Sequence, residues 1–120
     1  MKLKSIGFFK ELKHGDEDSE CLRLLTRKEA DKNENGILQY LSSGITICVS
    51  PGIVKDVLDD SKIIGSLSIL TDGIWVWPSD LLYYVKEYHI NLNNDFVLYM
   101  SQNNWTVPVK SEVNMEMLEL

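Results

Sequence analysis

The segment from Thr71 to His89 constrains the fold of this chain more than any other feature. The apolar run before it meets Asp72-Gly73, a dipeptide that accepts the positive φ angles of a tight hairpin turn. The residues after the turn alternate between two faces, as in a strand, and place Trp75 and Trp77 on the same face. The sequence therefore predicts an antiparallel hairpin over residues 66–77.

The same segment continues with the signals that begin a helix. Pro78 ends the strand because it has no N–H to donate to a neighbouring strand. Ser79 occupies the position of a helix cap, and Asp80 lies in the first turn, where the helix dipole favours negative charge. Apolar and aromatic residues then recur at helical spacing and are expected to form one buried stripe. The stripe consists of Leu81, Tyr84, Val85 and Tyr88.

The rest of the chain predicts one α+β domain spanning residues 1–120. Its sheet is expected to be small and antiparallel, to include the Asp-Gly hairpin and to pack against several short helices. Residues 6–12 fit a strand or a short helix, and residues 53–58 fit a short helix or an extension of the preceding strand. The tail at residues 110–120 would be ordered only by docking. The other expected elements are helices around residues 21–25, 37–41 and 94–100, a buried strand at residues 45–49 and an edge strand at residues 105–109.

Composition indicates a soluble globular protein. Of the 120 residues, 44% are hydrophobic and 25% are charged, and no apolar run is long enough to cross a bilayer. The N-terminus has charge but neither the apolar core nor the cleavage site of a secretion signal. Cys21 and Cys48 are therefore expected to remain reduced thiols, and the expected compartment is the cytoplasm.

The net charge of −6 is unevenly distributed. Residues 1–62 carry a net charge of −1, whereas residues 63–120 carry −5, because only Lys86 and Lys110 oppose seven acids. A nucleic-acid-binding protein needs a basic surface to displace counterions, so this distribution argues against direct nucleic-acid binding. An acidic surface suits a basic protein partner, but it also serves simply to keep a protein soluble.

One polar segment resembles part of a calcium-binding loop. Residues 31–38 place oxygen ligands at alternate positions, with Gly at the sharp turn and an apolar residue two positions later. Ser42 stands where a bidentate Glu should close the site, and Asp31 is the only charged residue among the expected ligands. Asn and Asp before Gly are also common in turns that link helices. The sequence therefore predicts no bound metal at Asp31–Gly36.

The sequence contains no recognised catalytic motif and no phosphate-binding glycine loop. His14 and His89 lie outside any metal-ligand spacing, and Cys48 on an apolar strand would resist ionisation. Asp72, Asp80 and His89 could form an acid–base site, but nothing in their spacing requires it. We therefore expect no enzymatic activity, no metal and no cofactor.

Acidic and aromatic side chains are the remaining candidates for a functional surface. The aromatic residues of the hairpin and of the helical stripe are expected to fill the core, since each buries a large apolar area. Tyr83 and Glu87 share the opposite helix face, and exposed Tyr beside acids is typical of protein-recognition surfaces. The predicted partner-binding residues are Asp16, Glu17, Asp18, Glu20, Asp72, Asp80, Tyr83 and Glu87.

Three segments of the chain resemble a widespread family of small bacterial cytoplasmic proteins. They are Ile6–Asp16, Gly44–Asp59 and Leu70–Val85, and the Asp-Gly-x-Trp-x-Trp-Pro block in the third segment is the most specific part. Such proteins are associated with immunity in polymorphic-toxin and contact-dependent growth inhibition systems. The resemblance implies an immunity protein that binds one cognate toxin domain, often a nuclease, and blocks its active site or substrate access. It implies no catalytic residues.

A second function class fits the same residues. A small regulatory or ligand-sensing domain without catalytic activity would close a pocket with Trp75, Trp77 and Tyr84. An adjacent upstream gene for a large secreted protein with a variable C-terminal domain would favour the immunity interpretation.

Overall fold

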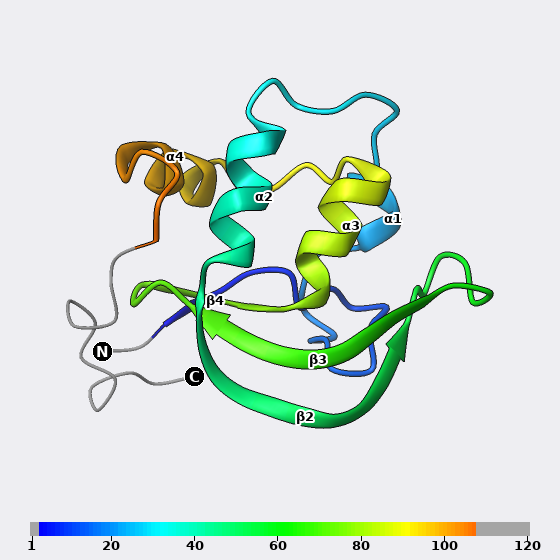
Figure 1. The fold of residues 1–120 in the computed structure, drawn as a ribbon. Helices are drawn as coiled ribbons and strands as arrows, with labels where there is room; N and C mark the ends of the chain where they lie inside the picture. Colours follow the sequence, from blue (N-terminus) through cyan, green and yellow to red (C-terminus); the bar gives the residue numbers. More distant parts are fainter. Residues whose placement is uncertain (1–2, 108–120) are drawn as a thin grey trace.

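Four strands form one mixed sheet in the computed structural model, which describes residues 3–107 (Figure 1). The strands are β1 (Lys4–Ser5), β2 (Ile45–Lys55), β3 (Ile63–Thr71) and β4 (Trp75–Pro78). Their order in the sheet is β1-β4-β3-β2, so β1 and β2 are the edges. β3 pairs antiparallel with both β2 and β4, whereas β1 pairs parallel with β4.

Helices accompany the sheet and make the fold α+β, as the sequence predicts. They are α1 (Leu22–Leu25), α2 (Glu34–Ser42), α3 (Asp80–Tyr88) and α4 (Asn94–Gln102). Figure 1 shows α2 and α3 on one side of the curved β2–β3 pair, with α4 beside α2. Within residues 3–107, no helix has the length and apolar character needed to span a bilayer.

The predicted hairpin and the helix after it are confirmed. β3 and β4 pair with Leu70 opposite Trp77, and the turn between them contains Gly73 at a φ of 99°. Ser79 occupies the cap position of α3, but its side chain makes no capping hydrogen bond. Its Oγ instead accepts a hydrogen bond of 2.8 Å from the backbone N–H of Ser68 on β3. Ser79 therefore attaches the start of α3 to β3.

The sheet is mostly antiparallel, as expected, but its β1–β4 pair is parallel, which the sequence did not predict. The parallel pair joins Lys4 to Trp75 and Ser5 to Val76 in register. Two backbone hydrogen bonds of 2.9 Å hold it, from Lys4 N–H to the Ile74 carbonyl and from Ile6 N–H to the Val76 carbonyl. β1 is only two residues long, so it shows no alternation in the sequence that would predict a strand.

The strand predicted at residues 45–49 is confirmed as the first part of β2, but the prediction that it is buried is wrong, because β2 is an edge strand. Cys48 is exposed, and Val49 is 67% exposed. The strand extends beyond Pro51-Gly52 to Lys55. An extension of the strand was one of the two alternatives predicted for residues 53–58, and it holds for residues 53–55. The pairing register with β3 shifts between Ser50 and Ile53, and such a bulge is common at sheet edges.

Helix α2 begins earlier than the sequence predicts. Glu34 and Gly36 lie in its first turn and not in a loop, so the calcium-like segment is partly helical. The side chain of Asp31 accepts a 2.8 Å hydrogen bond from Asn33 N–H and starts the turn that leads into the helix. A Cβ at Gly36 would lie 2.8 Å from the Trp105 ring, so close packing explains this Gly.

The N-terminal segment over residues 6–12 is neither of the two predicted elements. It is a series of turns in which Leu12 N–H bonds to the Phe9 carbonyl and Gly15 N–H to the Leu12 carbonyl, both at 3.1 Å. Phe9 and Leu12 are buried, so the segment is fixed by its side chains as well. At the other end of the chain, residues 105–107 form no strand, and the rest of that predicted strand and the 110–120 tail lie outside the described residues.

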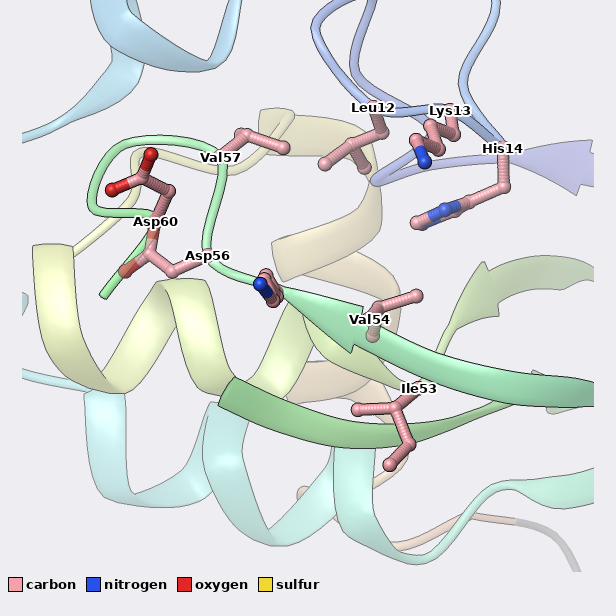
Figure 2. Close-up of a pocket in the computed structure, with 9 residues that line it drawn as sticks. Leu12, Lys13, His14, Ile53, Val54, Asp56, Val57 and Asp60 are labelled. Atoms are coloured by element: carbon pink, nitrogen blue, oxygen red, sulfur yellow. The ribbon is translucent and has the colours of Figure 1, made fainter. Parts of the chain in front are cut away.

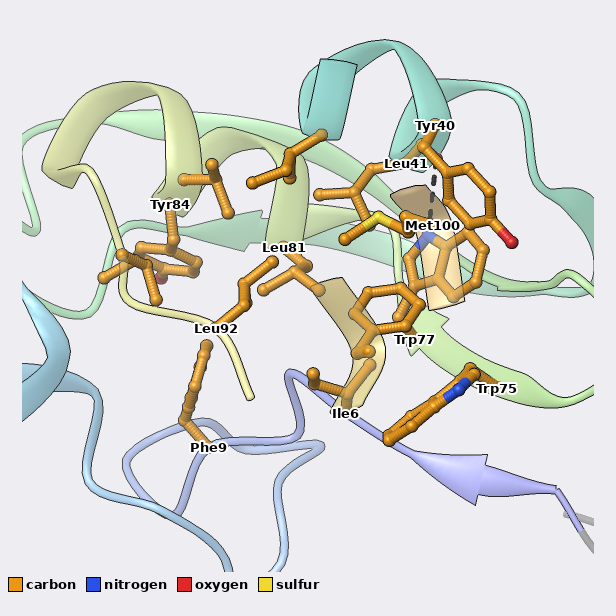
Figure 3. Packing of buried hydrophobic residues seen from close by; sticks show 14 of the residues in the cluster. Ile6, Phe9, Tyr40, Leu41, Trp75, Trp77, Leu81, Tyr84, Leu92 and Met100 are labelled. Carbon is orange, nitrogen blue, oxygen red and sulfur yellow. Dashed lines mark hydrogen bonds between the residues drawn. The ribbon is translucent and has the colours of Figure 1, made fainter. Parts of the chain in front are cut away.

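Aromatic rings form the centre of the core, as expected from the sequence (Figure 3). Phe96 on α4 contacts Trp75 and Trp77, with ring centroids 5.0 and 5.6 Å apart. The indole N–H of Trp77 donates a 3.3 Å hydrogen bond to the Leu41 carbonyl, so β4 is tied to α2. A Cβ at Gly44 would lie 2.6 Å from the Trp77 ring, which explains the absence of a side chain there.

Candidate functional site

The acidic loop, which we define as residues 16–20, is the most exposed charged feature among the predicted partner-binding residues. It contains no helix or strand. All four of its carboxylates are exposed and belong to Asp16, Glu17, Asp18 and Glu20. The loop therefore presents four negative charges within five consecutive residues.

Backbone hydrogen bonds hold both ends of the acidic loop. Asp16 N–H donates to the Phe8 carbonyl at 3.1 Å, and Lys10 N–H donates to the Glu20 carbonyl at 3.2 Å. Inside the loop, the Asp16 side chain accepts a 3.0 Å hydrogen bond from Asp18 N–H. The charges are thus carried on an ordered backbone.

Glu11 fixes the chain directly after the acidic loop. Its carboxylate accepts hydrogen bonds of 2.8 Å from Leu22 N–H and 3.0 Å from Arg23 N–H, at the beginning of α1. The thiol of Cys21 is also within hydrogen-bonding distance, at 3.4 Å. Partial burial raises the pKa of Glu11, but these hydrogen bonds outweigh it and leave the pKa below its ordinary value.

A cleft of about 370 Å³ separates the N-terminal segment from the end of β2 (Figure 2). In Figure 2, His14 projects from the N-terminal segment toward Val54 on β2. Ile53 on the β2 wall is 69% exposed, so the cleft opens to solvent. The apolar lining is Leu12, Ile53, Val54 and Val57, and the charged or polar lining is Lys13, His14, Lys55, Asp56 and Asp60.

A second cavity of about 300 Å³ shares His14 with the cleft. Its walls include Phe8 and Asp16 from the N-terminal segment and Ile69 and Val76 from the sheet. His14 therefore lies where the two cavities adjoin, two positions before the acidic loop.

His14 attaches the N-terminal segment to α3. Its Nε2 lies 2.9 Å from Oδ2 of Asp80, whose side chain is 1% exposed. Neither atom has a well-aligned hydrogen bond within the described residues, so the contact is one of charge when His14 is protonated. Asp80 also lies in the first turn of α3, where the helix dipole stabilises a carboxylate.

A second buried carboxylate, Asp56, attaches the end of β2 to the same helix. Its Oδ2 accepts hydrogen bonds from the hydroxyls of Tyr83 at 2.8 Å and Tyr88 at 2.5 Å. Partial burial and these hydrogen bonds raise the pKa of both tyrosines. The hydroxyl oxygen of Tyr84 accepts a 3.0 Å hydrogen bond from Val57 N–H, and burial raises its pKa to about 12.

The structure separates the predicted partner-binding residues. Asp72 and Asp80 are each 1% exposed and engaged inside the fold, so we remove them from the proposed contact surface. Tyr83 is half-buried with its hydroxyl bound to Asp56, so the expectation of a freely exposed tyrosine is wrong. Glu87 is exposed on α3, as predicted. Among the predicted partner-binding residues, only those of the acidic loop form one group of exposed neighbours in the sequence.

The acid–base grouping considered from the sequence is not assembled. Asp80 contacts His14, whereas Nδ1 of His89 lies 2.8 Å from Oε1 of Glu34 on α2. Asp72 instead accepts a hydrogen bond from the Tyr40 hydroxyl. Each of the three residues therefore has a structural partner of its own.

The sequence did not reveal the cleft, because its walls come from two segments about 40 positions apart. The Pro51-Gly52 pair within β2 was the one available signal, since it marks the bulge beside the exposed Ile53 at a sheet edge. No protein-family model, curated protein or solved structure matches this chain.

Proposed function

We propose that this protein is a cytoplasmic immunity protein that binds and neutralises a basic bacterial toxin domain. A nuclease fits this partner best, because nuclease active sites attract phosphate and are therefore basic. Binding by an acidic protein blocks the active site or the access of substrate.

The observation that carries this proposal is the ordered acidic loop. Its four exposed carboxylates stand on a backbone that hydrogen bonds to Phe8 and Lys10 hold in place. A loop that is already ordered loses less conformational entropy on binding than a flexible one. Charge that serves only solubility needs no such fixed backbone, because it acts through net repulsion.

A ligand-sensing domain is the second candidate, and the two cavities that share His14 favour it. Their volumes of about 370 and 300 Å³ lie at the lower end of those found for small-molecule sites. The aromatic pocket expected for this function does not form, since Trp75, Trp77 and Tyr84 are buried in the core. Any ligand would have to bind beside His14.

Co-expression tests the proposed function. The test requires an adjacent upstream gene for a large secreted protein with a variable C-terminal domain, and the absence of such a gene would count against the proposal. The probe is that C-terminal domain, produced in a sensitive bacterial strain with and without this protein. We expect survival only when both are present, and a 1:1 complex when an inactive form of the toxin domain is purified with it. A lack of rescue together with a lack of complex would contradict the proposal and favour the ligand-sensing domain.

A further inference from the structure

We propose that the cleft between residues 12–14 and the end of β2 binds a small anion that carries an apolar body. The anionic head group, a carboxylate or a phosphate, lies against Lys13 and Lys55, and the apolar body lies against the aliphatic side chains of the cleft. This inference goes beyond the proposed function and does not rest on it.

Two lysines supply the positive charge of the cleft. Lys13 on the N-terminal wall and Lys55 at the end of β2 both line it, and both are exposed to solvent. Within residues 3–107, neither ammonium group lies within ion-pair distance of a carboxylate. The fold therefore brings two unpaired cations from distant segments to one cleft, and together they attract an anion more strongly than either does alone.

The two acids that line the cleft leave this positive charge accessible. Asp56 is 1% exposed, and its carboxylate already accepts hydrogen bonds from two tyrosine hydroxyls of α3 and from two backbone N–H groups of the turn that follows it. Asp60 is exposed, but Figure 2 shows Val57 between it and the wall that carries Lys13 and His14. No residue of the acidic loop lines the cleft. The N-terminal wall therefore favours a negatively charged ligand.

Helix α3 holds both walls of the cleft in place. Asp80 on α3 contacts His14 of one wall at 2.9 Å. Two tyrosines of the same helix donate hydrogen bonds to Asp56, which follows the strand of the other wall. Neither lysine takes part in these contacts, so the cleft is formed before a ligand arrives and both ammonium groups remain available. Small-molecule sites are usually pre-formed in this way.

The rest of the lining suits a short hydrocarbon body. Leu12, Val54 and Val57 form its apolar part, and Ile53 stands at the rim with 69% of its surface exposed. The cleft volume of about 370 Å³ lies at the lower end of the range for small-molecule sites, which indicates a small ligand. A ligand with a charged head and a short aliphatic chain uses both parts of the lining, because the aliphatic side chains remove its chain from water. An inorganic anion uses the lysines alone.

The test compares ligands that share one octyl chain and differ in charge. The anionic probes are octanoate and octyl phosphate, with octanol as the neutral control and octylammonium as the cationic control. In methyl NMR titrations of the full-length protein, the anions should shift the signals of Leu12, Val54 and Val57 in a saturable way. The signals of Leu98, which is 58% exposed on α4, should not shift. We expect the better anion to bind at least about fivefold more tightly than octanol, and its identity assigns the head group.

Two double variants with equal charge changes test the role of the lysines. Lys13→Gln with Lys55→Gln removes both cations of the cleft, whereas Lys32→Gln with Lys86→Gln removes two exposed cations outside it. We expect the first pair to weaken binding of the better anion by about fivefold and the second pair to weaken it by less than about twofold. Thermal unfolding of both variants verifies that they are folded.

Three results would contradict the anion site. They are equal binding of octanol and the anions, equal loss of binding in the two double variants, and the absence of saturable shifts with either anion. Each of them leaves the proposed function standing, because the acidic loop lies outside the cleft. Conversely, saturable anion binding that requires Lys13 and Lys55 establishes the site even if the toxin domain gives neither rescue nor a complex.

Discussion

The hydroxyl of Tyr40 on α2 donates a 2.6 Å hydrogen bond to Oδ2 of Asp72 in the β3–β4 turn. The other oxygen of Asp72 accepts hydrogen bonds from Ile74 N–H at 2.9 Å and Trp75 N–H at 2.7 Å. Burial and the bond to Asp72 raise the pKa of Tyr40 far above its ordinary value. The carboxylate therefore closes the hairpin turn and joins it to a helix about 30 positions earlier in the chain.

Removal of the Asp72 carboxylate should destabilise the fold strongly. Asp72→Ala leaves three donors without their acceptor in a buried site, and we expect a loss of about 3–5 kcal/mol. Tyr40→Phe removes one hydrogen bond and should cost about 1–2 kcal/mol. Chemical denaturation measures both, with Asp60→Ala at an exposed position as the control that should change stability by less than about 0.5 kcal/mol. Equal stabilities for Asp72→Ala and the control would contradict the role of this contact.

The backbone of Gly73 gives a second prediction. Its φ of 99° is a conformation that β-branched residues rarely adopt, so Gly73→Val should lower stability by about 1–3 kcal/mol. Ser66→Val introduces the same side chain at an exposed position of β3 without a positive φ and serves as the control. An unchanged melting temperature in Gly73→Val would show that the turn does not need a glycine.

The hairpin and α3 were predictable because their signals are local. Asp72-Gly73 fixes the turn, and Pro78 with Ser79 fixes the start of the helix. The position of β2 at the sheet edge was not predictable, since its apolar composition is the same whether or not another strand covers it. The parallel β1 was missed because two residues carry no periodicity. The edge position of β2 and the formation of β1 both depend on pairing between distant segments of the chain.

Some residues of the candidate site were predictable from local sequence and others were not. Exposure of the acidic loop followed from a dense run of polar residues, and the structure bears it out. The burial of Asp80 did not follow, because the sequence gives no sign that His14 packs against the start of α3. The same holds for Tyr83, whose partner Asp56 is 27 positions away. Contacts between distant segments placed these side chains.

Glu11 provides a prediction for the dependence of stability on pH. Its folded-state pKa lies below the ordinary value of 4.5, so its contribution is present above that value and is lost as the pH falls through the folded-state pKa. Glu11→Gln should therefore be less stable than the wild type by about 1 kcal/mol at pH 7. The difference should disappear at a pH below the lowered pKa of Glu11. A difference that stays constant from neutral to strongly acidic pH would show that the charge of Glu11 is not involved.

Calcium should not stabilise the protein. In the segment that resembles a calcium-binding loop, Glu34 lies in the first turn of α2 and its carboxylate lies 2.8 Å from His89, while Ser42 stands at the closing position. We expect the melting temperature to be the same in millimolar calcium and in EGTA. A saturable increase that EGTA reverses would establish a metal site and contradict this account of Asp31–Gly36.

The central claim is that the acidic loop guides a basic toxin domain to this protein. Stopped-flow association of the inactive upstream-encoded domain tests it most directly, with Glu17→Lys compared against Asp95→Lys, which makes the same charge change at an exposed position on α4. Attraction between opposite charges raises association rates, and salt screens it beyond about 10 Å at 0.1 M. The account predicts fast association that slows with added salt, with a larger reduction for Glu17→Lys than for Asp95→Lys. Absence of binding, or equal effects of the two substitutions at every salt concentration, would contradict it.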